Sequence, residues 1–343
     1  MGEYTSNEGF FKGWNNSMDI KSLKPFGQVK LNEPLAKHTT FKIGGPADCL
    51  VIVEDTDKLV GLLKYLDGEG TSYMIIGGGS NMLASDEGFQ GVVIKVHSSK
   101  FIVQGDTLIV DAGCIIVVMA QESIKAGLIG FEWGVGVPGT IGGAVRGNAG
   151  AMGGEIKDVV EKVEIYRDGE VVTLNHQQCH FGYRDSMFKH SRSVIIRAYL
   201  RLQKNTKNTK TLEPMKKALE YLQYRSKTQP QGWANTGCIF KNVDLEGKPG
   251  EAQRLRLLQH FDAKDEKVQE FLRKEKISAG WLVEQAGMRG VRVGQAQVSE
   301  RHGNFIVNLG GARAQDVQSL IARIKDKVYD RFGIKLEEEI QII

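Results

Sequence analysis

The chain has 343 residues, a length that at roughly 100 to 200 residues per domain predicts two or three domains. Its 45 basic and 41 acidic residues are spread along the chain, so the formal charge of +4 excludes a basic stripe for nucleic acid and fits a small anionic ligand better. Signal-peptide patterns, apolar runs of membrane length and zinc-ligand spacings are absent from the sequence, so we expect a cytoplasmic protein with reduced thiols, no metal and no membrane insertion.

The first two thirds of the chain alternate short apolar, β-branched runs with helical patterns. The runs predict strands at residues 50–53, 73–76, 92–96, 108–110, 162–166 and 194–202. Helical spacing is typical of residues 59–66, which follow an acidic start, and of residues 117–126. Short strands interleaved with few helices predict an α+β fold with mixed or antiparallel sheets.

The last third indicates a domain of its own. A polar stretch at residues 203–211, QKNTKNTKT, is the best candidate for a linker or surface loop. After it, helices are predicted at residues 212–224, 278–285 and 314–332, strands at 296–298 and 304–307, and a C-terminal helix cap at Gly333. We therefore predict an N-terminal arm at residues 1–29 and domains at residues 30–206 and 207–343.

Glycine is the compositional outlier. Its 41 residues are about 12% of the chain against a usual ~7%. They crowd at Gly44-Gly45, at Gly77-Gly78-Gly79 and between residues 134 and 150. Consecutive glycines after a strand let backbone N–H groups converge on an anion, although the second stretch matches neither a Walker A loop nor a Rossmann fingerprint. A turn without a ligand explains that loop alone equally well, but three separated stretches predict a long ligand such as FAD.

Eight motifs follow one another from about residue 30 to residue 343, and they read TTFKIGGPA, IIGGGSNML, GVPGTIGGAVRGNAGAMGGEI, FGYRDSMF, GCIFKN, SAGWLVEQAGMRG, GQAQVSERHGNFIVN and GIKLEEEI. In sequence and order they resemble one known family, that of UDP-N-acetylenolpyruvoylglucosamine reductase (MurB), in its branch without a substrate-closing tyrosine loop. The resemblance implies the two-subdomain FAD-binding fold of the vanillyl-alcohol oxidase type, followed by a small α+β substrate-binding domain.

The same resemblance implies the cofactors and their residues. FAD would be bound without a covalent link, and NADPH would reduce it; the substrate would be UDP-N-acetylglucosamine enolpyruvate, in peptidoglycan synthesis. The flavin pyrophosphate is assigned to Gly77, Gly78, Gly79, Ser80, Asn81 and Met82, and the rest of the flavin to Thr40, Ile43, Thr140, Gly142, Gly143 and Asn148. A monomer is expected.

Reduction of an enolpyruvyl double bond leaves negative charge at C2 beside a carboxylate, and that carbon must then receive a proton. By the resemblance, Arg184 stabilises the charge, Cys238 takes the place of a proton-donating serine, and Glu339 is the catalytic acid of the C-terminal motif, with the register among residues 337–339 left open. Without the resemblance, Arg184 is more simply a loop arginine paired with Asp185, and Cys238 is equally a nucleophile, a metal ligand or core filler.

Further residues are assigned to the substrate. Arg225 and Lys227 would meet its phosphates, with Tyr183 and Asn242 as additional contacts, whereas His302 is as consistent with a structural role. The sequence departs from the family pattern in the spacing of Lys227 and in an insert at residues 243–277, whose apolar spacing predicts a surface helical hairpin near the site.

Three competing functions remain open at this point. A flavin oxidase or dehydrogenase acting on an alcohol or hydroxy acid shares the fold but not the C-terminal motifs. An inactive FAD-binding protein is compatible with cysteine in place of serine at position 238. A thiol-dependent hydrolase lacks a recognisable histidine partner for its cysteine.

Overall fold

The protein is described by a computed structural model that covers residues 20–205 and 212–343. The chain forms two compact units. Unit 1 contains the residues up to Pro34 together with Pro46–Gly78 and Gly88–Gln223, and unit 2 contains Leu35–Gly45, Gly79–Glu87 and Tyr224–Ile343. The sequence-based division at residues 206 and 207 differs from this grouping, because two short segments of the predicted first domain belong to unit 2.

Long-range packing explains why those two segments join unit 2. Phe41, Ile43 and Leu83 are buried in its core, and strand β4 (Met82–Leu83) pairs in parallel with β21 (Gln341–Ile342) at the end of the chain. Local patterns carry no information about a strand partner more than 250 residues away, so the sequence could not predict this exchange.

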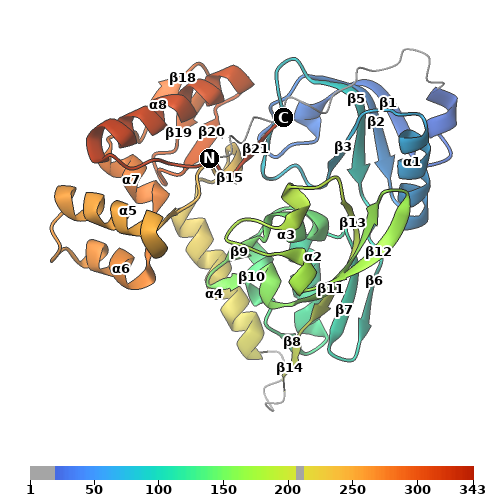
Figure 1. Cartoon of the computed structure of the whole chain (residues 1–343), viewed down its shortest axis with the longest axis horizontal. Helices are drawn as coiled ribbons and strands as arrows, with labels where there is room; N and C mark the ends of the chain where they lie inside the picture. Colours follow the sequence, from blue (N-terminus) through green and yellow to red (C-terminus); the bar gives the residue numbers. More distant parts are fainter. Residues whose placement is uncertain (1–19, 206–211) are drawn as a thin grey trace. The chain divides into compact units, whose positions relative to one another are not determined.

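Unit 1 is built around two sheets (Figure 1). A mixed four-stranded sheet has the order β1-β2-β5-β3, and an antiparallel five-stranded sheet has the order β12-β11-β13-β7-β6. One mixed and one antiparallel sheet are what the predicted α+β class requires. The bounds of the strands are Gln28–Pro34 (β1), Pro46–Val53 (β2), Tyr73–Ile76 (β3), Phe89–Val96 (β5), Phe101–Gln104 (β6), Thr107–Asp111 (β7), Val160–Arg167 (β11), Glu170–Asn175 (β12) and Val194–Arg201 (β13).

The helices of unit 1 follow their sequence signals. Helix α1 (Thr56–Gly68) begins where the Asp55 side chain accepts hydrogen bonds from the backbone N–H groups of Asp57 and Lys58. Its apolar residues recur at helical spacing and are buried. Helix α2 (Ile116–Lys125) comes before the glycine-rich stretch at residues 134–150, and the short helix α3 (Ile141–Gly147) lies within that stretch. Helix α4 (Leu212–Thr228) begins in unit 1 and ends in unit 2.

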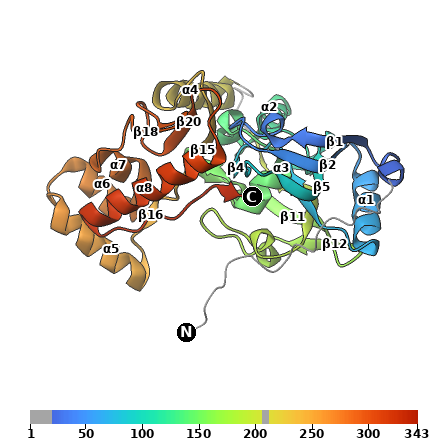
Figure 2. The same ribbon diagram turned by 90° about the horizontal axis from the view of Figure 1, so that it is seen from above.

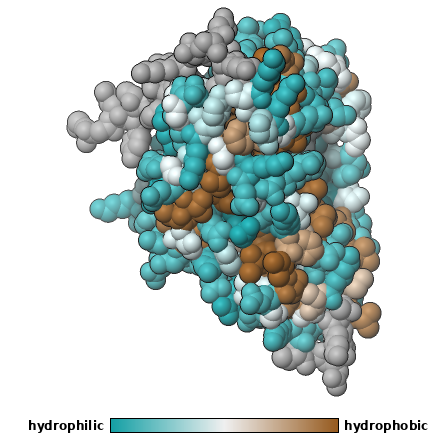
Figure 3. All heavy atoms as spheres, turned by 90° about the vertical axis from the view of Figure 1, so that its right-hand side faces the viewer, coloured by the Kyte–Doolittle hydropathy of each residue, from teal (hydrophilic) through white to brown (hydrophobic). Residues whose placement is uncertain are grey.

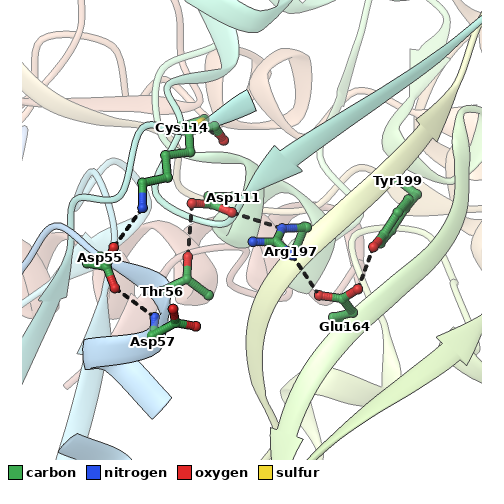
Figure 4. Close-up of polar contacts among 9 residues, drawn as sticks. Asp55, Thr56, Asp57, Asp111, Cys114, Glu164, Arg197 and Tyr199 are labelled. Atoms are coloured by element: carbon green, nitrogen blue, oxygen red, sulfur yellow. Dashed lines mark hydrogen bonds and ion pairs between the residues drawn. The ribbon is translucent and has the colours of Figure 1, made fainter. Parts of the chain in front are cut away.

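A polar network ties helix α1 to the five-stranded sheet of unit 1 (Figure 4). The Thr56 hydroxyl at the start of α1 donates to Asp111 over 2.9 Å, and the Arg197 guanidinium donates to the same carboxylate over 3.0 Å. Arg197 also forms an ion pair with Glu164 at 3.2 Å, and Glu164 accepts from the Tyr199 hydroxyl. Because Asp111 is 1% exposed, its paired charge holds α1, β7 and β13 in one fixed arrangement.

One edge of the five-stranded sheet is open. All four residues of β6 are exposed, and brown, apolar side chains interrupt the mostly teal face that Figure 3 shows. The large exposed apolar residues of β6 are Phe101, Ile102 and Val103.

Unit 2 is a smaller α+β unit. Its antiparallel sheet has the order β15-β20-β19-β18, with bounds Ala234–Cys238 (β15), Arg292–Val293 (β18), Ala296–Val298 (β19) and Phe305–Asn308 (β20). Helix α7 (Ala279–Gln285) and helix α8 (Ala314–Phe332) supply apolar residues to its core. Gly333 follows α8 in the left-handed conformation at φ +66°, as a glycine helix cap requires.

The insert forms a helical hairpin of α5 (Gly247–His260) and α6 (Glu266–Lys274), which lie side by side in Figures 1 and 2. Val243 and Asp244 (β16) pair with Lys276 and Ile277 (β17) at its base. Phe261 lies 4.4 Å from Trp281 and 5.0 Å from Phe332 between ring centroids. The hairpin is therefore part of the unit 2 core and not only a surface addition.

The predicted linker is structured at its start. Gln203–Lys204 (β14) pairs with Leu128–Ile129 (β8), whereas residues 206–211 lie outside the described part of the chain, as do residues 1–19 of the predicted arm. The remaining short strands are Gly150–Ala151 (β9) and Gly154–Glu155 (β10), which form a hairpin.

Candidate active site

In unit 1 two of the predicted glycine stretches pack against each other. A Cβ built on Gly77 would lie 2.3 Å from the Thr140 hydroxyl, and one on Gly78 would lie 2.9 Å from the Cα of Gly139. Such contacts are too close for any side chain, so glycine is required at both positions. The loop after β3 therefore approaches the loop before α3 backbone to backbone.

Helix α3 is anchored by its own N-terminal groups. The Gly142 N–H donates to Ala112 over 2.8 Å, and the Gly143 N–H donates to the Thr140 hydroxyl over 3.4 Å. Thr140 is thus an N-cap residue as well as a neighbour of Gly77. Because the Gly142 N–H is already bonded, its predicted contact with a flavin would be made by its Cα face.

Asn148 caps the other end of α3 in the left-handed conformation, with φ +42°. Its side chain is fully buried and donates to the Gly182 carbonyl over 2.7 Å and to Glu155 over 3.2 Å. Its side-chain oxygen accepts from the Lys157 N–H over 3.1 Å. These bonds use both hydrogens of the side-chain amide, so the side chain of Asn148 is committed to the protein.

Tyr183 and Arg184 form the tip of a tight turn closed by backbone hydrogen bonds between Gly182 and Asp185. Arg184 has φ +56°, which is unusual for a side chain other than glycine or asparagine. Its guanidinium donates to the Gly150 carbonyl over 2.8 Å and lies 5.3 Å from the Tyr183 ring centroid. Asp185 is paired with His190 at 2.9 Å, so the alternative Arg184–Asp185 ion pair is not the arrangement in the structure.

In unit 2, Gly79 at the end of the Gly77-Gly78-Gly79 stretch packs on the residues that precede Gly44-Gly45. Gly79 has φ +61°, and a Cβ there would lie 2.2 Å from the His38 carbonyl oxygen. The Thr40 N–H donates to the Gly79 carbonyl over 3.0 Å, and the Thr40 hydroxyl donates to the Asn235 carbonyl over 2.8 Å. Ile43 is 2% exposed and lies in the core of unit 2.

A β-bulge presents Cys238. Strand β15 pairs with β20, and its register shifts between Asn235 and Cys238. Gly237 has φ +80°, and its N–H donates to the Asn235 side chain over 3.1 Å. A bulge with glycine in the left-handed conformation re-aims the next side chain. Of the four cysteines only Cys238 is partly exposed, whereas the other three are buried.

Arg225 lies near this cysteine. Burial lowers the pKa of the Arg225 guanidinium, and the negative charge of the Cys238 thiolate acts in the opposite direction. Lys227 is exposed on the same helix. Asn242 accepts the Ala279 N–H over 3.1 Å at the start of α7, so at least its oxygen serves the fold.

The C-terminal segment brings Glu339 to the strand of Cys238. The Glu339 N–H donates to the Ile239 carbonyl over 2.7 Å, and the Asn81 side chain donates to the Glu339 carbonyl over 3.1 Å. The two preceding carboxylates form ion pairs with lysines: Glu337 with Lys241 at 3.0 Å and Glu338 with Lys325 at 2.9 Å.

His302 has a packing environment. Its ring centroid lies 5.0 Å from the Phe305 ring centroid, its Nδ1 accepts the Asn304 N–H over 3.1 Å, and burial lowers its pKa.

Two of the remaining predicted core residues are cysteines. Burial raises the pKa of Cys49 to about 11 and that of Cys114 to about 12, as expected of core thiols. Among the described residues no cluster of His, Cys, Asp and Glu could hold a metal ion, and no helix is long and apolar enough to cross a membrane.

The glycine loop fits a dinucleotide. A Cβ at Gly77 or Gly78 would fill the space where the loops meet. No acceptor within residues 20–205 and 212–343 takes the backbone N–H of Gly78 or Gly79. Adjacent N–H groups without protein acceptors are the donors that a pyrophosphate requires.

This fold and this loop define a flavin-binding oxidoreductase: residues 47–175 match the family described as "FAD binding domain", and residues 229–343 match "UDP-N-acetylenolpyruvoylglucosamine reductase, C-terminal domain". A reductase of that name from Caldanaerobacter subterraneus is 37% identical over 94% of this chain and 96% of its own. One from Bacillus subtilis is 36% identical over 92% and 94%. The crystal structure of the Thermus caldophilus enzyme (MurB) has a TM-score of 0.70 and 32% identity, covering 92% of this chain and 98% of that one. The chain belongs to the UDP-N-acetylenolpyruvoylglucosamine reductase family.

The family membership confirms the predicted fold class, the FAD cofactor with NADPH as reductant, and the reductase function. Sequence reasoning missed Asn304, whose buried side chain bonds both the N–H and the carbonyl of Phe240 and so fixes the strand end beside Cys238. It also missed Lys189, which donates to the Arg184 carbonyl over 2.6 Å. Neither residue stands in a spacing that indicates such a role.

Proposed function

We propose that Cys238, Arg184 and Glu339 carry out the reduction of UDP-N-acetylglucosamine enolpyruvate to its lactyl ether, the reaction that serves peptidoglycan synthesis. The observation that carries the proposal is the bulge at Gly237, which presents one partly exposed thiol beside the Glu339 backbone and near the Arg225 charge. Cys238 and Glu339 come from segments about 100 residues apart in the sequence. Active sites are typically assembled by folding from such distant segments.

When bound, FAD would supply the hydride-transfer chemistry for reduction of the enolpyruvyl group, with NADPH as the reductant. In this proposal Gly77, Gly78 and Gly79 hold the pyrophosphate through backbone N–H groups. Ser80, Asn81 and Met82 complete the pyrophosphate site, and Thr40, Ile43, Thr140, Gly142 and Gly143 line the remainder of the cofactor.

Arg184 stabilises the negative charge that develops at C2 and on the adjacent carboxylate. A guanidinium is always charged and presents its donors in a planar fork that matches a carboxylate. Its hydrogen bond to Gly150 and its contact with the Tyr183 ring support this role, because both restrict the guanidinium before substrate binds.

Cys238 donates the proton to C2. A thiol with a reference pKa of ~8.5 is mostly protonated at neutral pH and is a stronger acid than a serine hydroxyl. The nearby Arg225 guanidinium stabilises the thiolate that remains after the transfer. Donation therefore remains possible with cysteine at this position.

Glu339 polarises the substrate carboxylate or holds a proton beside it, and Arg225, Lys227, Tyr183 and Asn242 contact the rest of the substrate. The partly buried Arg225 suits a phosphate oxygen better than the exposed Lys227 does. We further propose that the protein acts in the cytoplasm as a monomer.

The proposal is tested by two anaerobic reactions of the purified protein. NADPH should bleach the visible absorbance of the flavin, and UDP-N-acetylglucosamine enolpyruvate should restore it. Bleaching that the substrate does not reverse would overturn the proposed substrate and favour an oxidase or dehydrogenase. Protein that takes up no FAD would contradict the cofactor assignment.

A further inference from the structure

The Tyr183–Arg184 turn holds its arginine in a conformation that the residue does not favour. Arg184 has φ +56° at the tip of the turn, and asparagine or glycine would adopt that region more readily. A left-handed arginine persists only where surrounding contacts fix it. The contacts that do so are identifiable in unit 1.

Asn148 holds the first residue of the turn. Its side-chain amide donates to the Gly182 carbonyl over 2.7 Å, and Gly182 forms the two backbone bonds that close the turn with Asp185. The second amide hydrogen goes to Glu155 over 3.2 Å, and Glu155 is also paired with Lys157 at 2.7 Å. Because Asn148 is fully buried, these bonds do not compete with water.

Lys189 holds the arginine itself. Its ammonium donates to the Arg184 carbonyl over 2.6 Å, which is the length of a charge-assisted hydrogen bond. The bond fixes the peptide plane that follows Arg184 and therefore fixes its ψ angle. Ser186 closes the far side of the turn by donating to the Arg146 carbonyl over 2.6 Å.

The guanidinium is fixed at its other end by the β9–β10 hairpin. It donates to Gly150 over 2.8 Å, and a Cβ on Gly150 would lie 3.2 Å from Arg184 Nη1. Glu155 of the same hairpin accepts from Asn148. The backbone of Arg184, through Gly182, and its guanidinium, through the β9–β10 hairpin, are thus both connected to Asn148.

We propose that Asn148 and Lys189 are positioning residues that hold the Tyr183–Arg184 turn, and with it the Arg184 guanidinium, in the geometry that stabilises charge on the substrate. The inference rests on the proposed role of Arg184. The side chain of Asn148 serves the arginine, although the sequence pattern assigned this residue to the flavin.

Asn148→Gly is the sharpest variant, because glycine accepts the left-handed conformation and only the side-chain amide is lost. Asp168→Gly is its matched control: Asp168 is also left-handed, at φ +52°, and is exposed in the turn between β11 and β12. Lys189→Met removes the ammonium at similar length, and Lys189→Arg restores a charged donor.

The two anaerobic half-reactions separate positioning from general damage. We expect Asn148→Gly and Lys189→Met to slow flavin reoxidation by substrate roughly 10- to 100-fold, as a misplaced group does, and to leave reduction by NADPH within about twofold. Lys189→Arg should recover much of the lost rate, and Asp168→Gly should match the wild type. Equal slowing of both half-reactions would overturn the inference.

Hydrogen exchange gives a readout that needs no turnover. In Asn148→Gly the backbone amides of Gly182 and Asp185, which bond across the turn, should exchange at least about tenfold faster than in the wild type. Unchanged exchange at these amides would mean that Asn148 does not hold the turn, and it would overturn the inference whatever the kinetics.

A double-mutant cycle with Arg184→Ala separates the proposed role of Arg184 from the proposed positioning role of Asn148. If Asn148 acts through Arg184, Asn148→Gly should slow reoxidation in the wild type but not in Arg184→Ala. The same slowing in both backgrounds would overturn the positioning role. Reoxidation that Arg184→Ala leaves unchanged would instead refute the proposed role of Arg184, and the exchange experiment would then decide whether Asn148 holds the turn.

Discussion

Cys238 differs from the other cysteines by its surroundings. Cys49, Cys114 and Cys179 are buried, and burial raises the pKa of each thiol to about 11 or 12, so that they remain protonated and inert. Cys238 is partly exposed at the end of a bulged strand and near a guanidinium. Partial exposure beside a positive charge is the environment of a thiol that takes part in chemistry.

The three consecutive glutamates allow a matched test at the residue scale. Glu339→Gln should lower the rate of flavin reoxidation by substrate roughly 100-fold if the carboxylate acts in proton transfer or charge stabilisation. Glu338→Gln, which removes the ion pair with Lys325, should change that rate by less than about threefold because a partly exposed ion pair on the protein surface contributes little. Stopped-flow absorbance of the flavin measures both, and the reverse order of effects would assign the role to Glu338.

Motif spacing indicated candidate residues for the site, but it did not indicate which partners these residues have in the structure. The spacing of Tyr183, Arg184 and Asp185 indicated an arginine contact or an ion pair within the motif. The structure pairs Asp185 with His190 and Arg184 with Gly150, which lies 34 residues earlier. Such partners depend on how distant turns pack, and no local pattern contains that information.

At the scale of elements, the glycine-rich stretches predicted close backbone approaches, and two of these stretches do pack against each other. Gly77 and Gly78 contact Thr140 and Gly139, which belong to the glycine-rich stretch at residues 134–150. A sequence shows only that a close approach is possible, whereas the structure shows that the approach is between the loops themselves as well as toward a ligand.

The contact between these loops can be tested with one methyl group. Gly77→Ala places a Cβ 2.3 Å from the Thr140 hydroxyl, so we expect FAD affinity to fall at least about tenfold and stability to fall by about 1 to 3 kcal/mol. Gly68→Ala is the control, since a Cβ there meets nothing within 4 Å at the end of α1. Fluorescence titration with FAD and thermal unfolding measure the two effects. Unchanged FAD binding in Gly77→Ala would refute the cradle.

The helical insert shows both the reach and the limit of sequence patterns. Its helices were predicted from apolar spacing, and α5 and α6 occur where expected. The packing of the insert onto the rest of unit 2 was not predicted, because the aromatic rings involved come from three separate segments. Phe261 packs on Trp281 of α7 and on Phe332 of α8. Strand β15 was missed for a related reason, since its bulge breaks the alternation that identifies strands.

Phe261→Ala tests whether the insert is integral to unit 2. Loss of the two ring contacts should lower the free energy of unfolding by about 2 kcal/mol, less than the ~3–5 kcal/mol of a fully buried phenylalanine because Phe261 is half-buried. Leu255→Ala, on the exposed side of α5, should change it by less than ~0.5 kcal/mol. Urea denaturation would measure both, and equal values would show that the hairpin packs only loosely.

For the whole molecule, the α+β class and the order of the two domains followed from strand lengths, helix spacing and motif order. The composition of the units did not, because residues 35–45 and 79–87 of the first half belong to unit 2. The parallel pairing of β4 with β21 joins the first quarter of the chain to its last residues. The chain therefore completes unit 2 only when its C-terminus is present.

Anaerobic stopped-flow absorbance of the flavin in Cys238→Ala, compared with Cys238→Ser and the wild type, is the most direct measurement of the proposed chemistry. NADPH should reduce the flavin at similar rates in all three proteins, because proton donation belongs to the second half-reaction. Reoxidation by UDP-N-acetylglucosamine enolpyruvate should be roughly 100-fold slower with alanine and should stay close to the wild-type rate with serine. Reoxidation that alanine leaves unchanged, or a loss confined to flavin reduction, would contradict proton donation by Cys238.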